Sequence, residues 1–174
     1  MYTIGKFLGA GLFANVFRLK EYPLWCVKVS KWTNRKSTLE EQFAKAQILQ
    51  RLGVPVPTFL GVYEVTFPSY FKKTIEKQYR RGEISWWRYW NLCRIKEGMK
   101  LGLVMETVES DLTLVSSRRV KYHFRKEISK VKAMGIKVSF DADSRENILW
   151  SQKQGKLYFI DFDFWRIPRK IINQ

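Results

Sequence analysis

Residues 4–19 read IGKFLGAGLFANVFRL, two apolar runs on either side of a turn that contains Gly9 and Gly11. The alternation of apolar and polar positions predicts two strands joined by a tight turn. Glycine lets a backbone approach a phosphate closely because it has no Cβ atom. The stretch therefore predicts a β-hairpin whose turn can lie against a phosphate.

A third strand is predicted at residues 24–29, which read LWCVKV. Lys28 stands among apolar neighbours in this strand, where its amine could neutralise the phosphates held by the preceding turn. The alternative is an edge-strand lysine that serves solubility. The lysine and the glycine turn together favour a phosphate site.

The composition restricts the class of protein without naming its partner. Apolar residues make up 45% of the chain, which is enough for a packed core, and the formal charge is +16. Such a charge attracts phosphates, nucleic acid or anionic membranes but does not choose among them. Cys26 and Cys93 have no metal-binding spacing and are expected to be core thiols in a reducing compartment.

No signal peptide and no apolar run of membrane-spanning length is recognised in the sequence. We therefore expect a protein without a transmembrane segment that acts in the cytoplasm, or in a host cytoplasm if it is injected or viral. Peripheral association with a membrane remains open.

The same patterns predict the rest of the chain. The predicted elements are a helix from Ser37 to Leu52 ended by Gly53, strands at 58–65 and 101–108, a helix from Val115 or Arg118 to Met134, and a hairpin that turns at Gln154-Gly155.

Residues 66–100 interleave lysine and arginine with tryptophan and tyrosine, and one or two amphipathic helices or a hairpin are expected there. These side chains could stack on bases and pair with phosphates, or lie at an anionic membrane surface. The third reading is a helical subdomain that packs its aromatics inward. The basic helix within 118–137 has the same ambiguity.

Further polar residues complete a set suited to phosphoryl transfer from ATP. Asn147 precedes an apolar run, and Asp161 and Asp163 follow another. Carboxylate and amide oxygens bind Mg²⁺, while backbone N–H groups and a lysine neutralise phosphates. The order of these parts predicts an ATP and Mg²⁺ site.

On these residues the chain resembles the protein-kinase-like superfamily. The matching motifs, in order, are Gly9-x-Gly11-x-x-Ala14-x-Val16, Cys26-Val27-Lys28, Leu103-Val104-Met105-Glu106, Asn147-Ile148-Leu149 and Ile160-Asp161-Phe162-Asp163. The missing activation segment makes the chain similar to small atypical members. These are RIO-type kinases, the small kinase of the archaeal tRNA-modifying complex, bacterial lipopolysaccharide core sugar kinases and minimal kinases injected as effectors.

The resemblance implies an α+β, two-lobed protein-kinase-like fold, with an antiparallel N-lobe sheet, one N-lobe helix and a reduced C-lobe. Residues 1–174 would form one minimal domain. The N-lobe would be residues 1–108, including the basic aromatic insertion at 66–100. Residues 109–174 would form the truncated C-lobe.

The resemblance also implies a role for each matching residue. Lys28 would hold the phosphates and pair with Glu41 or Glu40. Asn147 and Asp161 would bind Mg²⁺, with Asp163 either a second metal-facing carboxylate or a turn residue. The nucleotide-binding positions carried over are Gly9, Gly11, Ala14 and Val16 for the phosphates and Met105, Glu106 and Val108 for adenine.

The catalytic carboxylate has two candidates. The family places an Asp five residues before the Asn, and that position is Ala142, flanked by Asp141 and Asp143. The Asp141-Ala142-Asp143 triplet favours Asp143, whereas Ser139-Phe140-Asp141 favours Asp141. Either would orient the acceptor hydroxyl.

The function implied is ATP- and Mg²⁺-dependent phosphoryl transfer to a hydroxyl, with protein serine or threonine as the first acceptor. The alternatives are a kinase of an anionic sugar, lipopolysaccharide or lipid headgroup, and a catalytically weak pseudokinase or nucleic-acid-binding module.

Overall fold

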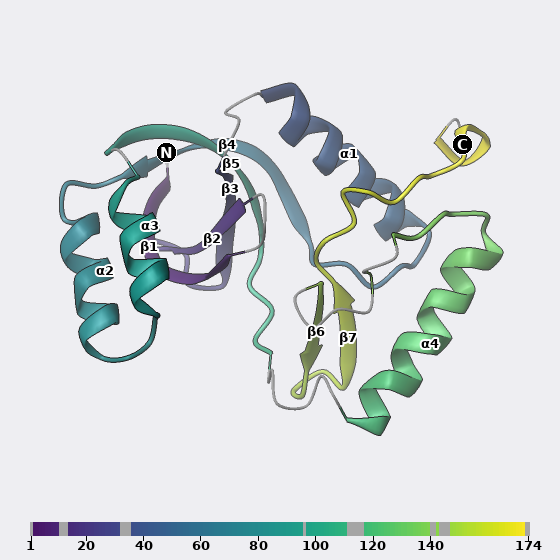
Figure 1. Ribbon diagram of the computed structural model, residues 1–174. Coiled ribbons are helices and arrows are strands. Elements are labelled where there is room, and N and C mark those ends of the chain that lie inside the picture. The colour runs from purple at the N-terminus through teal and green to yellow at the C-terminus, as the bar shows by residue number, and fades with distance from the viewer. Residues whose placement is uncertain are drawn as a thin grey trace. The chain divides into compact units, whose positions relative to one another are not determined.

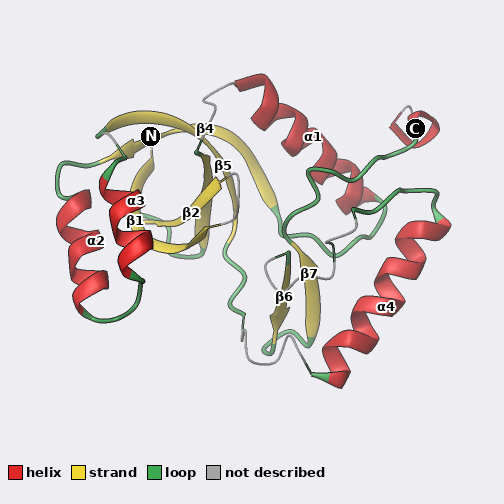
Figure 2. Cartoon of the chain, viewed as in Figure 1, coloured by secondary structure: helices red, strands yellow, loops and turns green. Residues whose placement is uncertain are grey.

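The computed structural model describes residues 2–10, 14–31, 36–95, 97–110, 117–139, 142 and 147–172. The chain divides into two compact units. The first contains Met1–Glu40 and Leu60–Thr107, and the second contains Glu41–Phe59 and Val108–Gln174. Figure 1 labels most elements of both units, and Figure 2 colours them by type.

The first unit is built on a closed five-stranded barrel with strand order β1-β2-β3-β5-β4. Pairing is antiparallel between β1 and β2, β2 and β3, and β3 and β5, but β1 and β4 run parallel. The strands are β1 (Tyr2–Ala10), β2 (Ala14–Leu19), β3 (Trp25–Ser30), β4 (Phe59–Phe67) and β5 (Gly98–Glu106).

The closed barrel shows that the predicted two-lobed protein-kinase-like fold, with its antiparallel N-lobe sheet, is wrong. Tyr2 and Thr3 of β1 pair with Val65 and Thr66 of β4, which joins the two strands that would form the edges of an open sheet. Closure satisfies backbone groups that an open edge leaves unpaired. Residues so far apart in sequence give no local signal of this pairing.

The barrel interior is filled by apolar side chains that alternate along the strands. Phe17 of β2 lies edge-on to Phe67 of β4, with ring centroids 5.3 Å apart. Phe71 contacts both rings at 5.7 and 5.0 Å. Each such buried side chain contributes about 1.5–3 kcal/mol of transfer free energy. These rings therefore join β2, β4 and the segment after β4 into one core.

Two helices, α2 (Phe71–Arg80) and α3 (Trp86–Cys93), lie between β4 and β5 in the chain. Helices were predicted in this segment, and the structure confirms them. Ile75, Ile84 and Leu92 are buried in the barrel core. The hairpin of α2 and α3 is therefore an integral part of the first unit (Figure 1).

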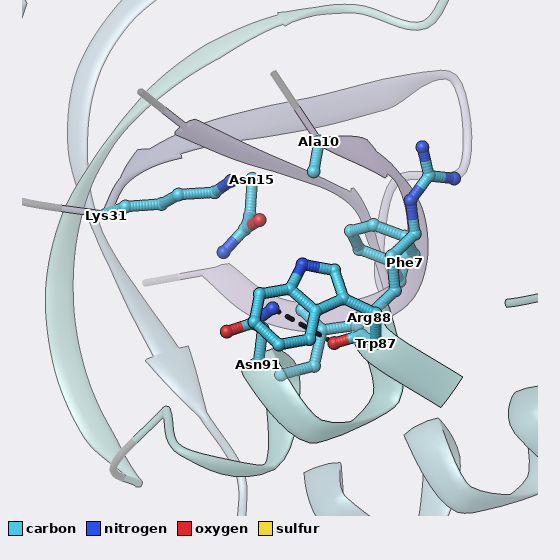
Figure 3. Close-up of a pocket in the computed structure, with 8 residues that line it drawn as sticks. Phe7, Ala10, Asn15, Lys31, Trp87, Arg88 and Asn91 are labelled. Carbon is cyan, nitrogen blue, oxygen red and sulfur yellow. Dashed lines mark hydrogen bonds between the residues drawn. The ribbon is translucent and has the colours of Figure 1, made fainter. Parts of the chain in front are cut away.

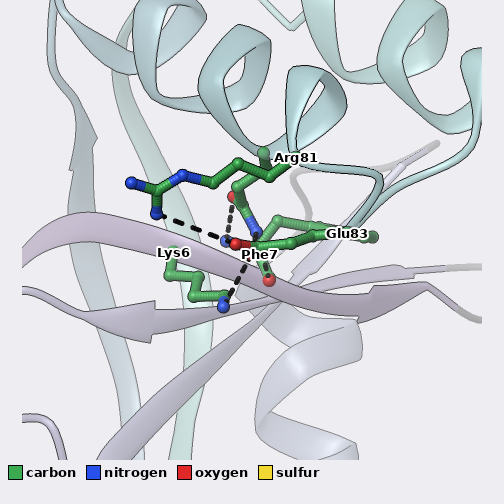
Figure 4. A network of polar contacts seen from close by, with 5 residues as sticks. Lys6, Phe7, Arg81 and Glu83 are labelled. Atoms are coloured by element: carbon green, nitrogen blue, oxygen red, sulfur yellow. Dashed lines mark hydrogen bonds and ion pairs between the residues drawn. The ribbon is translucent and has the colours of Figure 1, made fainter.

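A buried glutamine attaches α2 to the backbone of β1. The Phe7 N–H donates to Oε1 of Gln78, and Nε2 of Gln78 donates to the Phe7 carbonyl, both at 3.1 Å. Glu83 accepts from Nε2 of Gln78 at 3.5 Å and forms an ion pair with Lys6 at 2.7 Å. Figure 4 shows this network, in which an amide side chain takes the place of a neighbouring strand.

In the second unit, a two-stranded sheet and a helix share a core. Phe124 of α4 contacts Phe159 of β7 at 6.0 Å, and Phe159 contacts Trp165 at 5.1 Å. The elements are α1 (Lys36–Arg51), which belongs to this unit from Glu41 onward, α4 (Arg118–Ala133), β6 (Ile148–Ser151), β7 (Lys156–Phe159) and α5 (Arg169–Ile172).

Two glycines in this unit have the left-handed conformation that their turns require. Gly53 has a φ of 73° in the turn after α1, and Gly155 has a φ of 60° in the β6–β7 turn. Both positions were predicted from the sequence to end or reverse an element. None of the helices in the described ranges has the length and apolar character needed to cross a membrane.

Candidate functional site

The register of the barrel brings three predicted phosphate-site residues into one row. Gly9 of β1 is opposite Val16 of β2, Val16 is opposite Lys28 of β3, and Lys28 is opposite Leu103 of β5. Directly opposed residues on adjacent strands have neighbouring side chains. The row therefore crosses four adjacent strands with Lys28 within it.

The row lies on the face of the sheet that is turned away from the barrel core. Val27 and Val29 are both in the core, so Lys28 between them projects to the opposite face. A Cβ built on Gly9 meets no described atom within 4 Å. Among the described residues, none blocks the side of the Gly9 backbone on which a Cβ would lie.

Further predicted residues share this face because strand positions alternate. Ala14 is opposite Ser30, while Cys26 is opposite Met105 of β5. Ala14, Cys26 and Met105 are all buried. These apolar side chains lie on the same face as Lys28, and a role for them beside a nucleotide remains a prediction.

Arg18 is a residue of this face that the sequence analysis missed. It is opposite Cys26, two positions along β2 from Val16. Its Nε is buried and has no hydrogen-bond partner among the described residues. The signal was available in the alternation of Ala14, Val16 and Arg18, and the guanidinium adds a second positive charge beside Lys28.

The predicted adenine-contacting residues follow at the end of β5. The Thr107 N–H donates to the Leu24 carbonyl at 2.8 Å, and the Cys26 thiol lies 3.7 Å from the Glu106 carbonyl. Val108 follows and is half-buried. A role for Met105, Glu106 and Val108 in binding adenine remains a prediction.

Glu40 and Glu41 were the alternative partners of Lys28. They are consecutive exposed residues of α1, with Glu40 in the first unit and Glu41 at the start of the second. Pairing of either with Lys28 remains a prediction.

In the second unit the structure places Asn147 beside the segment that carries Asp161. The Ile160 N–H donates to the Asn147 carbonyl at 3.0 Å, which extends the β6–β7 ladder beyond its last pair, Ile148 with Phe159. The Asn147 side chain is buried and Asp161 is half-buried. Amide and carboxylate oxygens are ligands that Mg²⁺ accepts, and a role for Asn147 and Asp161 in binding it remains a prediction.

Asp163 is held by a structural contact of its backbone. Lys45 of α1 donates to the carbonyl of Asp163, and its amine lies 3.5 Å from the Phe162 carbonyl. Phe162 is buried against Phe59, with ring centroids 5.9 Å apart. This anchor fixes the chain directly after Asp161, whereas a metal-facing role for the Asp163 carboxylate remains a prediction.

Three predicted site residues, Gly11, Asp141 and Asp143, lie outside the described residues. Ala142 between the two aspartates is buried, and its N–H donates to the Ser139 carbonyl at 3.3 Å. Within the part of the chain that the structure describes, no three His, Cys, Asp or Glu side chains gather to hold a metal ion.

A cavity of about 170 Å³ lies in the first unit beside the last β1–β2 pair, Ala10 with Asn15. Figure 3 shows the Lys31 side chain reaching toward Asn15 and the Trp87 ring above Asn91. Asn91 donates to the Trp87 carbonyl at 3.0 Å. The lining residues are Phe7, Ala10, Asn15, Lys31, Trp87, Arg88, Asn91 and Leu92, which combine an aromatic wall with two cations and two amides.

Burial of Cys26 predicts a loss of stability at alkaline pH. Burial raises the pKa of its thiol from 9.0 to about 11, so the unfolded chain releases this proton first. The free energy of unfolding should therefore fall by about 2 kcal/mol between pH ~9 and ~11 through this group. Urea titrations across this range should show a smaller fall for Cys26→Ala than for wild type and Cys93→Ala. Equal falls in all three proteins would contradict the assignment.

No protein-family model matches the chain, and no curated protein matches it significantly. Function is therefore inferred from the geometry within each unit.

Proposed function

We propose that the protein transfers the γ-phosphoryl group of ATP to a hydroxyl group. The observation that carries this proposal is the row of Gly9, Val16 and Lys28 across adjacent strands, on the face turned away from the core. Phosphoryl transfer depends mainly on positioning and charge neutralisation, and this row supplies an approachable backbone and a fixed cation.

Each residue of the row has a separate role in the proposal. The backbone at Gly9 lies along the phosphates, since no side chain separates it from them. Lys28 neutralises the charge of the phosphates. Arg18 adds a second positive charge, since it lies two residues after Val16 in β2, on the same face of the strand. Ala14, Cys26 and Met105 bound the side on which the adenine ring lies.

The second unit contains the residues that the proposal assigns to Mg²⁺. Asn147 offers an amide oxygen and Asp161 a carboxylate oxygen, and Mg²⁺ prefers oxygen ligands. The Asn147 side chain is buried, which restricts its position. Mg²⁺ bound there would supply a divalent positive charge within the second unit. Asp143 or Asp141 would orient the acceptor hydroxyl.

The acceptor in the proposal is anionic. Protein serine or threonine was preferred only through the resemblance to a fold that the closed barrel contradicts. The formal charge of +16 instead favours a phosphorylated sugar or a lipid headgroup. A protein hydroxyl is retained as the second acceptor.

A transfer assay with γ-labelled ATP and Mg²⁺ tests the proposal. Lys28→Met keeps the apolar stem but removes the charge, and Asp161→Asn removes the carboxylate. Each should lower transfer by about 100-fold or more, the effect expected when a group that stabilises transferring charge is lost. Acceptors should include the protein itself, a protein mixture and extracted anionic lipids.

Lys100→Met is the matched control, because Lys100 is a half-buried lysine of β5 in the same barrel. It should transfer phosphate like wild type. Equal phosphoryl transfer by wild type and Lys28→Met would contradict the proposal. So would a loss of transfer in Lys100→Met as large as that in Lys28→Met.

A further inference from the structure

One face of α3 presents three tryptophans to solvent. Trp86, Trp87 and Trp90 are 58%, 68% and 49% exposed. Their spacing places them on one side of the helix, with Asn91 at its margin. On the opposite side, Leu92 is buried in the barrel core and Tyr89 stacks on Tyr79 at 4.8 Å. Packing on the barrel therefore fixes this tryptophan face outward.

Packing within the first unit does not explain why these tryptophans are exposed. Trp86 and Trp90 contact each other edge-on, with centroids 6.0 Å apart and planes at 67°. About half of each of these two residues remains exposed to water. An indole combines an apolar body with a polar N–H, which suits the boundary between lipid headgroups and acyl chains.

The hairpin that carries the tryptophan face is strongly basic. Between Phe71 and Ile95 it has seven cationic residues, namely Lys72, Lys73, Lys77, Arg80, Arg81, Arg88 and Arg94. The two glutamates of this segment are paired: Glu76 with Arg80 at 2.5 Å and Glu83 with Lys6 at 2.7 Å. The remaining charge complements an anionic surface.

The cavity beside Trp87 adds a site at the margin of the same face. Lys31 and Arg88 bring two cations to it, and Asn15 and Asn91 bring two amides. Cations and amide groups of this kind bind phosphate oxygens, and basic pockets next to a membrane receive lipid headgroups.

We propose that the first unit docks on an anionic lipid bilayer through the tryptophan face of α3, with a headgroup phosphate in the cavity beside Trp87. Single-stranded nucleic acid fits less well. Its bases need open ring faces with cations between them, whereas Trp86 and Trp90 meet edge-on. Arg88, the cation within α3, lies outside the tryptophan face. This docking does not require phosphoryl transfer, since Gly9, Val16 and Lys28 of the row do not line the cavity.

Vesicle flotation with the full chain tests the docking. Wild type should float with vesicles made of equal parts phosphatidylcholine and phosphatidylglycerol, and its tryptophan emission should shift to the blue. The triple variant Trp86→Ser, Trp87→Ser, Trp90→Ser should bind about tenfold more weakly. The control is Tyr22→Ser with Leu24→Ser, two exposed residues between β2 and β3 at the other end of those strands, and it should bind like wild type.

A second pair of variants tests the headgroup cavity at equal charge. Lys31→Ala with Arg88→Ala should weaken vesicle binding more than Lys72→Ala with Lys77→Ala, because only the first pair lines the cavity. Equal losses would overturn the cavity assignment. Absence of vesicle binding by wild type, or unchanged binding by the triple variant, would overturn the docking. So would tryptophan-dependent binding to oligouridine without binding to vesicles.

Discussion

Replacing Gly102 with valine is expected to lower the free energy of unfolding by about 3 kcal/mol or more, a large part of the stability of a small domain. Gly102 is a buried residue of β5 that faces Val27 of β3. A Cβ at this position would lie 2.3 Å from Cγ2 of Val27 and 3.3 Å from Cγ2 of Val29. The valine side chain is branched at Cβ and cannot rotate away from this contact as a long, flexible side chain can. Strands β3 and β5 would therefore have to separate.

The smaller change Gly102→Ala should lower the free energy of unfolding by about 1–3 kcal/mol for the same reason. Gly9→Ala is the control, since its Cβ would meet no described atom within 4 Å and Gly9 is also a strand glycine. It should change stability by less than about 1 kcal/mol. Urea denaturation of the three variants measures these values. Similar losses for Gly9→Ala and Gly102→Ala would show that β3 and β5 are not packed as described.

Replacing Gln78 with leucine is expected to lower the free energy of unfolding by about 2–4 kcal/mol. Leucine keeps most of the buried volume but leaves both the N–H and the carbonyl of Phe7 without the partners that Gln78 supplies at 3.1 Å. Each unsatisfied buried backbone group costs about 1–3 kcal/mol. The loss should be seen in urea denaturation, together with faster hydrogen exchange at the Phe7 amide.

Gln47→Leu is the matched control, because Gln47 is an exposed helical glutamine of α1. It should change stability by less than about 0.5 kcal/mol. A Gln78→Leu protein as stable as wild type, with a protected Phe7 amide, would contradict the proposed attachment of α2 to β1.

Local patterns in the sequence predicted most of the elements. The glycine turn between two apolar runs predicted β1 and β2, and the alternation of apolar and polar residues at 24–29 predicted β3. Gly53 and Gly155 marked the end of α1 and the β6–β7 turn, since only a residue without Cβ adopts their positive φ easily. These signals depend on neighbouring residues in the chain, so they can be recognised from the sequence alone.

Long-range pairing could not be predicted in this way. Closure of the barrel depends on Tyr2 and Thr3 meeting Val65 and Thr66, and no pattern within either strand specifies that neighbour. The attachment of Phe7 to Gln78 likewise joins residues far apart in the chain. Such contacts follow from the way the whole core packs.

Burial of aromatic residues was also difficult to predict. Phe162 and Phe164 stand on either side of Asp163, yet Phe162 is buried and Phe164 is 61% exposed. For residues 66–100, the prediction that aromatics pack inward holds for Phe71 but not for Trp86 or Trp87. Composition gives the number of aromatic rings, whereas the helix face decides which of them are buried.

For the candidate site, the order of residues was more informative than any single motif. Gly9, Val16 and Lys28 were chosen from the sequence, and the strand register places them in one row. Arg18 was missed because it was read only as part of an apolar run. Asp141 and Asp143 lie outside the described residues, so the choice between them remains a prediction.

Calorimetric titration with Mg²⁺ and ATP is the most direct test of the row as a nucleotide site. Wild type and Lys100→Met should bind with the same affinity, and Lys28→Met should bind at least about tenfold more weakly because it lacks a charge at the phosphates. Absence of ATP binding by wild type, or equal binding by wild type and Lys28→Met, would contradict the proposed role of the row.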